Sequence, residues 1–205
     1  MNTKDRILDK ALELMTVAGS DTVSTHEIAK HLGIRQSNIT YYFPSRTELL
    51  SALFKRMIEE VDRPVESLDP ENFSFITFYQ SLDKVMQVHE RYRFLLMNYG
   101  TLITTNPELN AHMVAVFKNR HQEFEGVLTL LSNNGFITGD QLFAQRVPVL
   151  HMLNMIIVYW VQEAAIYHQD KTDAEKRKHF LWLFFQVFIP YLTQKGKDDL
   201  LPLFN

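Results

Sequence analysis

Apolar side chains recur at helical spacing along nearly the whole chain and are separated by short polar breaks. Residues 3–18 repeat an apolar side chain every three or four positions, and Gly19 then ends the pattern. Only seven glycines and seven prolines interrupt the 205 residues, so helix breakers are few. The pattern predicts an all-α protein of about nine helices.

Two capping boxes frame a pair of short helices near the N-terminus. Residues 24–27 and 45–48 both have the form Ser-x-x-Glu, in which the serine hydroxyl accepts from the third helical amide and the glutamate reaches back. Between them, Gly33 favours a tight turn, and Pro44 ends the helix predicted over 36–42. We therefore expect a helix-turn-helix inside an N-terminal three-helix domain.

The second of these short helices has a polar outer face. If Ile39 points into the domain, every side chain on the opposite side can hydrogen-bond or stack, and none is acidic. The outward residues are Gln36, Ser37, Asn38, Thr40 and Tyr41. Such a face can enter the major groove of DNA without repelling phosphates. The alternative, a three-helix unit with a merely solvated face, stays open.

Three stretches of the first 60 residues resemble the tetracycline-repressor (TetR) family of regulators. They are ILDKALEL at 7–14, VSTHEIAKHLGI at 23–34 and ITYYFPSRTELL at 39–50. The ending YYFPSR-x-ELL and its distance from IA-x-x-LG are the specific features. The remainder of the chain matches the family only in being all-helical and of suitable length.

The resemblance implies a DNA-binding role for particular residues. It makes 36–42 the recognition helix, with these residues at its DNA-facing positions: Gln36, Ser37, Asn38, Thr40, Tyr41 and Tyr42. Thr25 and His26 stand at the start of the preceding helix, which touches the DNA backbone. Arg46 stands where the family usually has a lysine that contacts phosphate.

Two positions depart from the family pattern. Arg35 stands where a small N-cap residue is common, so the cap must come from elsewhere and Arg35 is expected to add a phosphate contact. Thr40 stands where tyrosine is common. Both departures change which operator sequence is expected, and neither changes the expectation of DNA binding.

A second domain follows the helix-turn-helix. Two prolines within residues 63–70 predict a linker. The linker divides the chain into a DNA-binding domain at 1–63 and a larger antiparallel helical domain at 64–205, expected to bind an effector and to dimerise. The helices predicted in the larger domain cover 72–90, a segment ending near 103, 107–133, 138–169 and 172–195.

The last two predicted helices are apolar nearly all round. A helix that is apolar on every face must be buried on every face, and a second subunit is the simplest cover. The resemblance likewise implies that the last two long helices pair with those of a partner in a four-helix bundle. The expected interface residues are Trp160, Phe184, Phe185 and Phe188. The alternative is that these helices form the core of a monomer.

Large, adaptable apolar side chains in the second domain are candidates for the wall of an effector pocket. They are Phe75, Tyr79, Phe94, Met97, Met113, Phe117 and Met155, with His121, His151 and Asn154 as polar anchors. Ordinary core packing is the alternative for each of them. Because the basic residues of this domain do not cluster as a phosphate site requires, the expected effector is a small apolar or aromatic molecule.

Composition excludes several other classes. The chain has no cysteine and a net charge of −3, and residues 1–63 carry nine basic and nine acidic side chains. DNA binding therefore has to rest on local geometry rather than on bulk charge. Neither metal-ligand spacing nor a nucleophile or phosphate-loop motif occurs, so we expect no metal site, no cofactor and no enzyme activity. The N-terminus has no apolar signal segment and the longest apolar run is short, so a cytoplasmic protein without a membrane association is expected.

Together these features predict a homodimeric transcriptional repressor. Two recognition helices would bind successive major grooves of a pseudo-palindromic operator, and a small apolar effector would release the DNA. Two alternatives are a DNA-binding dimer controlled by a protein partner without a small ligand, and an activator. An enzyme is the most remote possibility.

Overall fold

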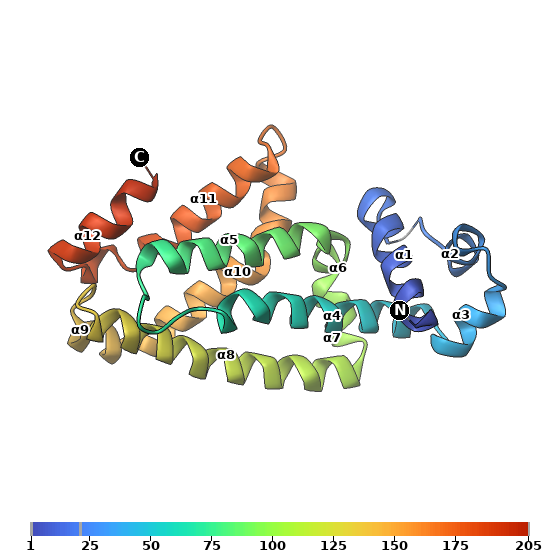
Figure 1. The fold of residues 1–205 in the computed structure, drawn as a ribbon, viewed down its shortest axis with the longest axis horizontal. Coiled ribbons are helices and arrows are strands. Elements are labelled where there is room, and N and C mark those ends of the chain that lie inside the picture. The colour runs from blue at the N-terminus through green and yellow to red at the C-terminus, as the bar shows by residue number, and fades with distance from the viewer. Residues whose placement is uncertain (1, 21, 205) are drawn as a thin grey trace.

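The chain folds into a small head and a long body that share one helix (Figure 1). The computed structural model describes residues 2–20 and 22–204. This part of the chain contains twelve α-helices and two short 3-10 turns. The all-α fold class is confirmed, and the number of helices exceeds the expected nine.

The head contains the three helices that the sequence predicts. They are α1 (Thr3–Ala18), α2 (Thr25–Leu32) and α3 (Gln36–Tyr42). The Ser24 capping box is formed, and Gly33 takes the left-handed conformation with φ of 65°. Ile7, Ile28 and Ile39 are fully buried between the helices. The turn between α2 and α3 therefore has the geometry that a glycine permits and a side chain disfavours.

Helix α4 (Arg46–Glu66) leaves the head and runs into the body, where it packs against α5 (Phe75–Arg91). The linker predicted from residue 63 is wrong in its first residues, because α4 continues through Pro64. Val61 is buried and Val65 packs against the core on the same side of the helix. The free energy gained from this apolar contact exceeds the cost of the backbone hydrogen bond that Pro64 cannot donate. The domain boundary at residue 63 stays a prediction.

The body is completed by helices that run back and forth along its length (Figure 1). They are α6 (Arg93–Met97), α7 (Tyr99–Thr104), α8 (Pro107–Asn133), α9 (Gly139–Ala144), α10 (Arg146–Tyr167), α11 (Asp173–Gln186) and α12 (Gln194–Leu200). Short 3-10 turns cover Ile189–Tyr191 and Leu201–Phe204. Helix α12 lies at the end of the body that is far from the head.

Two of the long helices predicted from the sequence are divided by prolines. The segment predicted as one helix over 138–169 breaks between α9 and α10. Helix α9 ends at Ala144, four residues before Pro148. The segment predicted over 172–195 ends at Gln186, four residues before Pro190. In both cases the proline has no amide for the carbonyl four residues earlier, and its ring crowds that carbonyl.

An aromatic cluster forms the core of the body. Its rings come from α5, α8, α11 and the turn after α11, with centroids 5.3–6.4 Å apart, and they belong to Phe75, Phe78, Phe124, Phe184, Phe185 and Phe188. The prediction that Phe184, Phe185 and Phe188 lie at a subunit interface is wrong, because at most 1% of each is exposed in the single chain. Trp160, at 2%, is buried in the same way. Neighbouring helices of the same subunit cover the faces that a partner was expected to cover.

The C-terminal segment closes the far end of this core. The backbone amide of Phe75, at the start of α5, donates to Asp199 Oδ2 at 2.7 Å. Helix α12 also lies so close to the turn at Phe136 that a Cβ on Gly196 would be 2.0 Å from the Phe136 carbonyl oxygen. Gly196 is thus required for the backbone approach that docks α12.

Candidate nucleic-acid interface and effector cavities

Helix α3 presents the outer face that the sequence predicts. Ile39 is fully buried, and the six other residues of the helix are exposed: Gln36, Ser37, Asn38, Thr40, Tyr41 and Tyr42. Tyr41 is 80% exposed, and its ring lies edge-on to Tyr42 with centroids 5.1 Å apart. A ring that is held in place by its neighbour but remains open to solvent is suited to contact a base or a sugar.

The start of α2 and the start of α3 are joined by a side-chain hydrogen bond. Gln36 Nε2 donates to Thr25 Oγ1 at 3.3 Å, so these two candidate DNA-binding residues lie side by side. His26 is exposed beside Thr25. Arg35 is exposed at the N-cap position of α3 and makes no capping bond there, as its length implies. The backbone amides at the start of α3 are therefore left without a side-chain cap.

Arg46 has a different role from the one predicted for it. Its Nη1 donates to the Val23 carbonyl oxygen at 2.7 Å, and its Nη2 is buried without a partner. A guanidinium in this position is not available to phosphate, so the predicted direct contact does not fit the structure. Arg46 instead ties the start of α4 to the segment that leads into α2.

The fold adds one cation to the candidate interface that the sequence pattern did not indicate. Lys4 Nζ lies 5.8 Å from the centroid of the Phe43 ring, at the end of α3. Lys4 is in the first turn of α1, and only the tertiary packing of α1 beside Phe43 brings it near the recognition helix. No local sequence signal could have placed it there.

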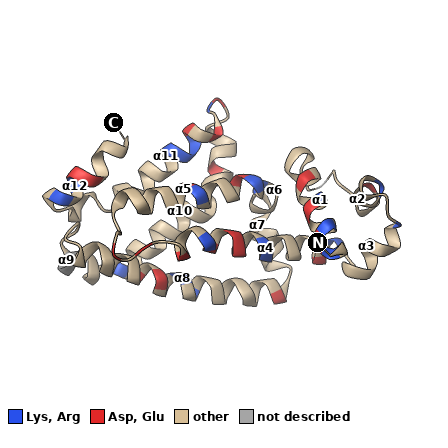
Figure 2. Ribbon diagram, in the orientation of Figure 1, with Lys and Arg blue, Asp and Glu red and all other residues tan. Residues whose placement is uncertain are grey.

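Charge is sparse around α3. Figure 2 shows no acidic residue along α3. The basic Arg35 is the residue directly before this helix. The candidate interface is thus a mainly uncharged hydrogen-bonding face with a few cations at its edges. Such a face favours contacts with base edges over a strong general attraction to phosphate.

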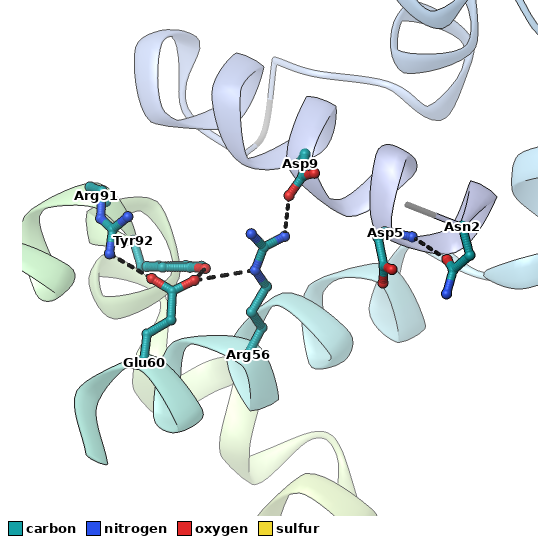
Figure 3. Close-up of polar contacts among 7 residues, drawn as sticks. All are labelled: Asn2, Asp5, Asp9, Arg56, Glu60, Arg91 and Tyr92. Carbon is teal, nitrogen blue, oxygen red and sulfur yellow. Dashed lines mark hydrogen bonds and ion pairs between the residues drawn. The ribbon is translucent and has the colours of Figure 1, made fainter. Parts of the chain in front are cut away.

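A network of ion pairs joins the head to the body (Figure 3). Arg56 of α4 donates to Asp9 of α1 at 2.5 Å and to Glu60 at 3.2 Å. Glu60 also accepts from Arg91 at 2.5 Å and from the Tyr92 hydroxyl at 2.8 Å. Burial, followed by the bond to Glu60, raises the pKa of Tyr92. The network fixes α1 relative to both α4 and the end of α5.

Two small cavities lie inside the body, each with a volume of about 90 Å³. The first, which we call the Phe184 cavity, is lined by residues of α4, α5, α8, α10 and α11, including His121 and Asn154. The second, the His89 cavity, is lined by residues from α4 to α8 and α10, including Met113, Phe117 and Asn154. Four residues predicted to line a pocket therefore do so: Met113, Phe117, His121 and Asn154.

The other six predicted pocket residues lie elsewhere and do not line either cavity. Phe75 is in the aromatic core, Tyr79 stacks on Phe185 and Phe94 is buried beside Tyr92. Met97, His151 and Met155 are exposed on the surface. Sequence spacing indicates that such residues share helix faces, but it does not distinguish a face that borders a cavity from one that is fully packed or open.

One face of α10 carries large apolar side chains that the described part of the chain leaves largely exposed to solvent. The exposed residues are Val147, Met152, Met155, Tyr159, Ile166 and Tyr167, with Trp182 of α11. Of the described helices, α10 alone has the length and hydropathy of a membrane span, and a third of that window is buried. Because α10 packs against α5, α8 and α11, its apolar character has a packing role. The interface residues predicted on α10 and α11 are buried, and the exposed apolar face lies on another side of α10.

Two short helices joined at a left-handed glycine, with a polar and acid-free second helix, define a helix-turn-helix DNA-binding protein. A family model for tetR-type bacterial regulatory proteins matches residues 7–53, and one for TetR bacterial transcriptional repressors matches residues 56–200. The chain belongs to the TetR family of bacterial transcriptional regulators.

Relatives of known function are regulators of the same type. The chain is 25% identical over 127 residues to the negative transcriptional regulator IcaR of the biofilm operon icaADBC of Staphylococcus epidermidis, a match that covers 58% of this chain and 66% of that protein. It is 24% identical over 121 residues to IcaR of Staphylococcus aureus, covering 58% and 63%. The chain thus spans about two thirds of the length of these relatives.

Solved structures share the fold over nearly the whole chain. A TetR-family regulator from Marinobacter aquaeolei VT8 has a TM-score of 0.86 at 22% identity, with 99% of this chain and 97% of that chain covered. A transcriptional regulator from Saccharomonospora viridis, in complex with choline, has a TM-score of 0.68 at 18% identity, with 93% and 98% covered.

Proposed function

We propose that this TetR-family regulator is a homodimeric repressor that acts in the cytoplasm on a pseudo-palindromic operator and is released by a small apolar effector. The observation that carries the DNA-binding part is the exposed, acid-free face of α3, held on a head whose three helices pack around Ile7, Ile28 and Ile39. Gln36, Asn38 and Tyr41 are the residues that reach base edges in this proposal. Thr25, His26, Arg35 and Lys4 contact the DNA backbone.

The uncovered apolar face of α10 supports the dimer. Exposed methionine, tyrosine and isoleucine side chains on one helix face are unfavourable in water and favour association with a like face. A two-fold pairing through α10 and α11 would place the two heads on the same side of the dimer. Each head would then bind one half of the operator.

The cavities inside the body support a small ligand. Each lies between α4 and the rest of the body, and α4 leads directly into the head. A ligand that binds more tightly when α4 is displaced would shift the population of the dimer toward a head spacing that fits the operator poorly. The coupling between ligand and DNA would be about 1–3 kcal/mol, as for most allosteric proteins.

The test begins with DNA selected by the purified protein from a random pool, followed by gel-shift titration. We expect a pseudo-palindromic consensus. Gln36→Ala should weaken binding to it by about 1–3 kcal/mol and relax the preference at defined positions, because an amide that contacts a base edge is lost.

The matched control for this test is Gln122→Ala, which removes an exposed glutamine of α8 on the body. It should leave affinity and preference unchanged. The DNA-binding assignment fails if Gln36→Ala behaves like this control.

A further inference from the structure

A buried hydrogen bond between two helices determines the chemistry of the His89 cavity. Trp160 Nε1 of α10 donates to His89 Nδ1 of α5 at 3.1 Å. His89 is 5% exposed and Trp160 is 2% exposed. Among the described residues, the second ring nitrogen of His89, Nε2, has no hydrogen-bond partner.

This hydrogen bond fixes the position of the proton on His89. The indole nitrogen of tryptophan can only donate, so the nitrogen that accepts from it must be unprotonated. In a neutral imidazole the single proton is then on Nε2. Burial, together with the nearby charge of Arg120, lowers the pKa of His89 to about 3, so the ring stays neutral at physiological pH.

The fixed donor belongs to the wall of the cavity. His89 lines it with Arg120 and Asn154, and the other lining residues are aliphatic, aromatic or methionine side chains. Because Nδ1 is turned toward Trp160, the Nε2–H group points away from Trp160 on the opposite edge of the ring. This donor has no acceptor among the described residues, and a ligand in the cavity that supplies one gains a hydrogen bond that the protein itself does not make.

We propose that the effector is an uncharged, mainly apolar molecule with one hydrogen-bond acceptor, such as a ketone, ester or amide carbonyl, which accepts from His89 Nε2–H in the His89 cavity. This inference rests on the proposed function of the body as an effector-binding unit. It names the chemical class of the ligand and the residue that selects it.

The charges around the cavity favour a neutral ligand. Arg120 pairs with Asp62 of α4, so its charge is already compensated. A carboxylate would add an unbalanced negative charge beside Asp62, and an ammonium group would meet a guanidinium and an N–H donor. A neutral carbonyl satisfies the donor and leaves the ion pair intact.

The apolar remainder of the ligand has a place to extend. The His89 and Phe184 cavities share Arg120, Asn154 and Ile157 as wall residues, and each is too small for a drug-sized molecule. Movement of Asn154 and Ile157 would join them. The carbonyl would then lie at His89 while the apolar part reached the rings of the Phe184 cavity.

The experiment measures direct binding of three matched probes to the full chain without DNA. Acetophenone has a carbonyl, ethylbenzene has the same carbon skeleton without one, and benzoate has a charged acceptor. By calorimetry or ligand-observed NMR we expect acetophenone to bind about tenfold more tightly than ethylbenzene, which corresponds to one hydrogen bond. Benzoate should bind more weakly than acetophenone.

A double variant removes the donor without leaving an unpaired partner. His89→Leu combined with Trp160→Phe replaces both members of the hydrogen bond with apolar groups, a change that can be nearly neutral for folding. In this variant ethylbenzene should bind as before, and the preference for acetophenone should disappear. The matched control Tyr79→Phe alters a ring outside both cavities and should keep the preference.

Nitrogen-15 NMR of histidine-labelled protein gives a readout that does not depend on ligand affinity. The ligand-free protein should show His89 as a neutral ring protonated on Nε2, and acetophenone should shift that resonance. A proton on Nδ1, equal binding of acetophenone and ethylbenzene, tighter binding of benzoate, or no binding of any probe overturns the inference.

Gel shifts with the selected operator separate this inference from the proposed function. Operator binding by the wild type without any carbonyl preference leaves the DNA-binding role standing and rejects the ligand class. A clear carbonyl preference without operator release supports the ligand class and rejects release by the effector.

Discussion

Glu60 accepts hydrogen bonds from three side chains at the joint between head and body. Its donors come from α4, from the end of α5 and from Tyr92, and Arg56 extends the network to Asp9 of α1 (Figure 3). The Glu60 side chain is only 12% exposed, so solvent screens these interactions less than it screens surface ion pairs. The residue is thus positioned to determine how firmly the head is held.

Glu60→Gln tests this role at the scale of one residue. The change keeps the shape of the side chain and removes its charge, so Arg91 loses its counter-ion and Arg56 keeps only Asp9. We expect the free energy of unfolding to fall by about 1–3 kcal/mol, measured by urea denaturation. Glu59→Gln, at the exposed neighbouring position, is the control and should change stability by less than about 0.5 kcal/mol. Equal effects of the two changes would contradict the prediction.

The lowered pKa of His89 predicts that the free energy of unfolding depends on pH. Its pKa is about 3 in the folded chain and about 6.5 when unfolded. The unfolded state therefore binds the proton first as pH falls, so the stabilisation from the neutral ring is complete above about pH 6.5 and is lost progressively toward pH 3.

Urea titrations at pH 7 and pH 5 would measure this loss, with a limiting slope of about 1.4 kcal/mol per pH unit for one proton. The His89→Leu, Trp160→Phe double variant contains every other titratable group and should lose less stability over the same interval. An identical loss in the two proteins would contradict the assignment of this dependence to His89.

At the scale of an element, α10 has two faces with different roles. One face packs Leu150, Leu153 and Trp160 into the body, and the other leaves Met155 and Ile166 exposed, each 60%. Burial of the second face requires another molecule. A charge on that face should therefore disrupt association without disrupting the fold.

Met155→Glu is the corresponding change. We expect the parent to sediment as a dimer of 24.1 kDa chains and the variant as a folded monomer with unchanged helix content by circular dichroism. Phe184→Glu provides the contrast, because it places a charge in the aromatic core and should unfold the chain. A parent that sediments as a monomer at micromolar concentration would refute the α10 interface.

The same element explains how far the sequence could predict the structure. The starts of α2 and α4 could be predicted because a serine that accepts from the amide three residues later is a local hydrogen-bonding pattern, which Ser24 and Ser45 both form. Of these two, Ser24 alone has the complete capping box. Which apolar face of α11 is covered depends on α5 and α8, which lie far away in the sequence. The aromatic run around Phe184 therefore indicated burial but not what covers it.

At the scale of the whole molecule, some features of the candidate site could be predicted from the sequence and others could not. The exposed face of α3 could be predicted because Ile39 alone sets the orientation of a short helix. The buried attachment of Arg46 to the Val23 carbonyl and the pairing of His89 with Trp160 join residues 23 and 71 positions apart. No periodicity in the sequence encodes such contacts. The first contact anchors the start of α4 to Val23, and the second fixes the hydrogen-bond donor of His89 in the body.

The continuity of α4 restricts how the length of this chain can change over evolutionary time. Each residue of an α-helix adds about 1.5 Å and a turn of about 100°. One residue inserted in α4 ahead of Arg56 would rotate the head around the helix axis and separate Arg56 from Asp9. The loop at 67–74 can gain or lose residues without turning either part. Descendants of this gene should therefore accumulate substitutions in α4 and insertions or deletions in the loop that follows it.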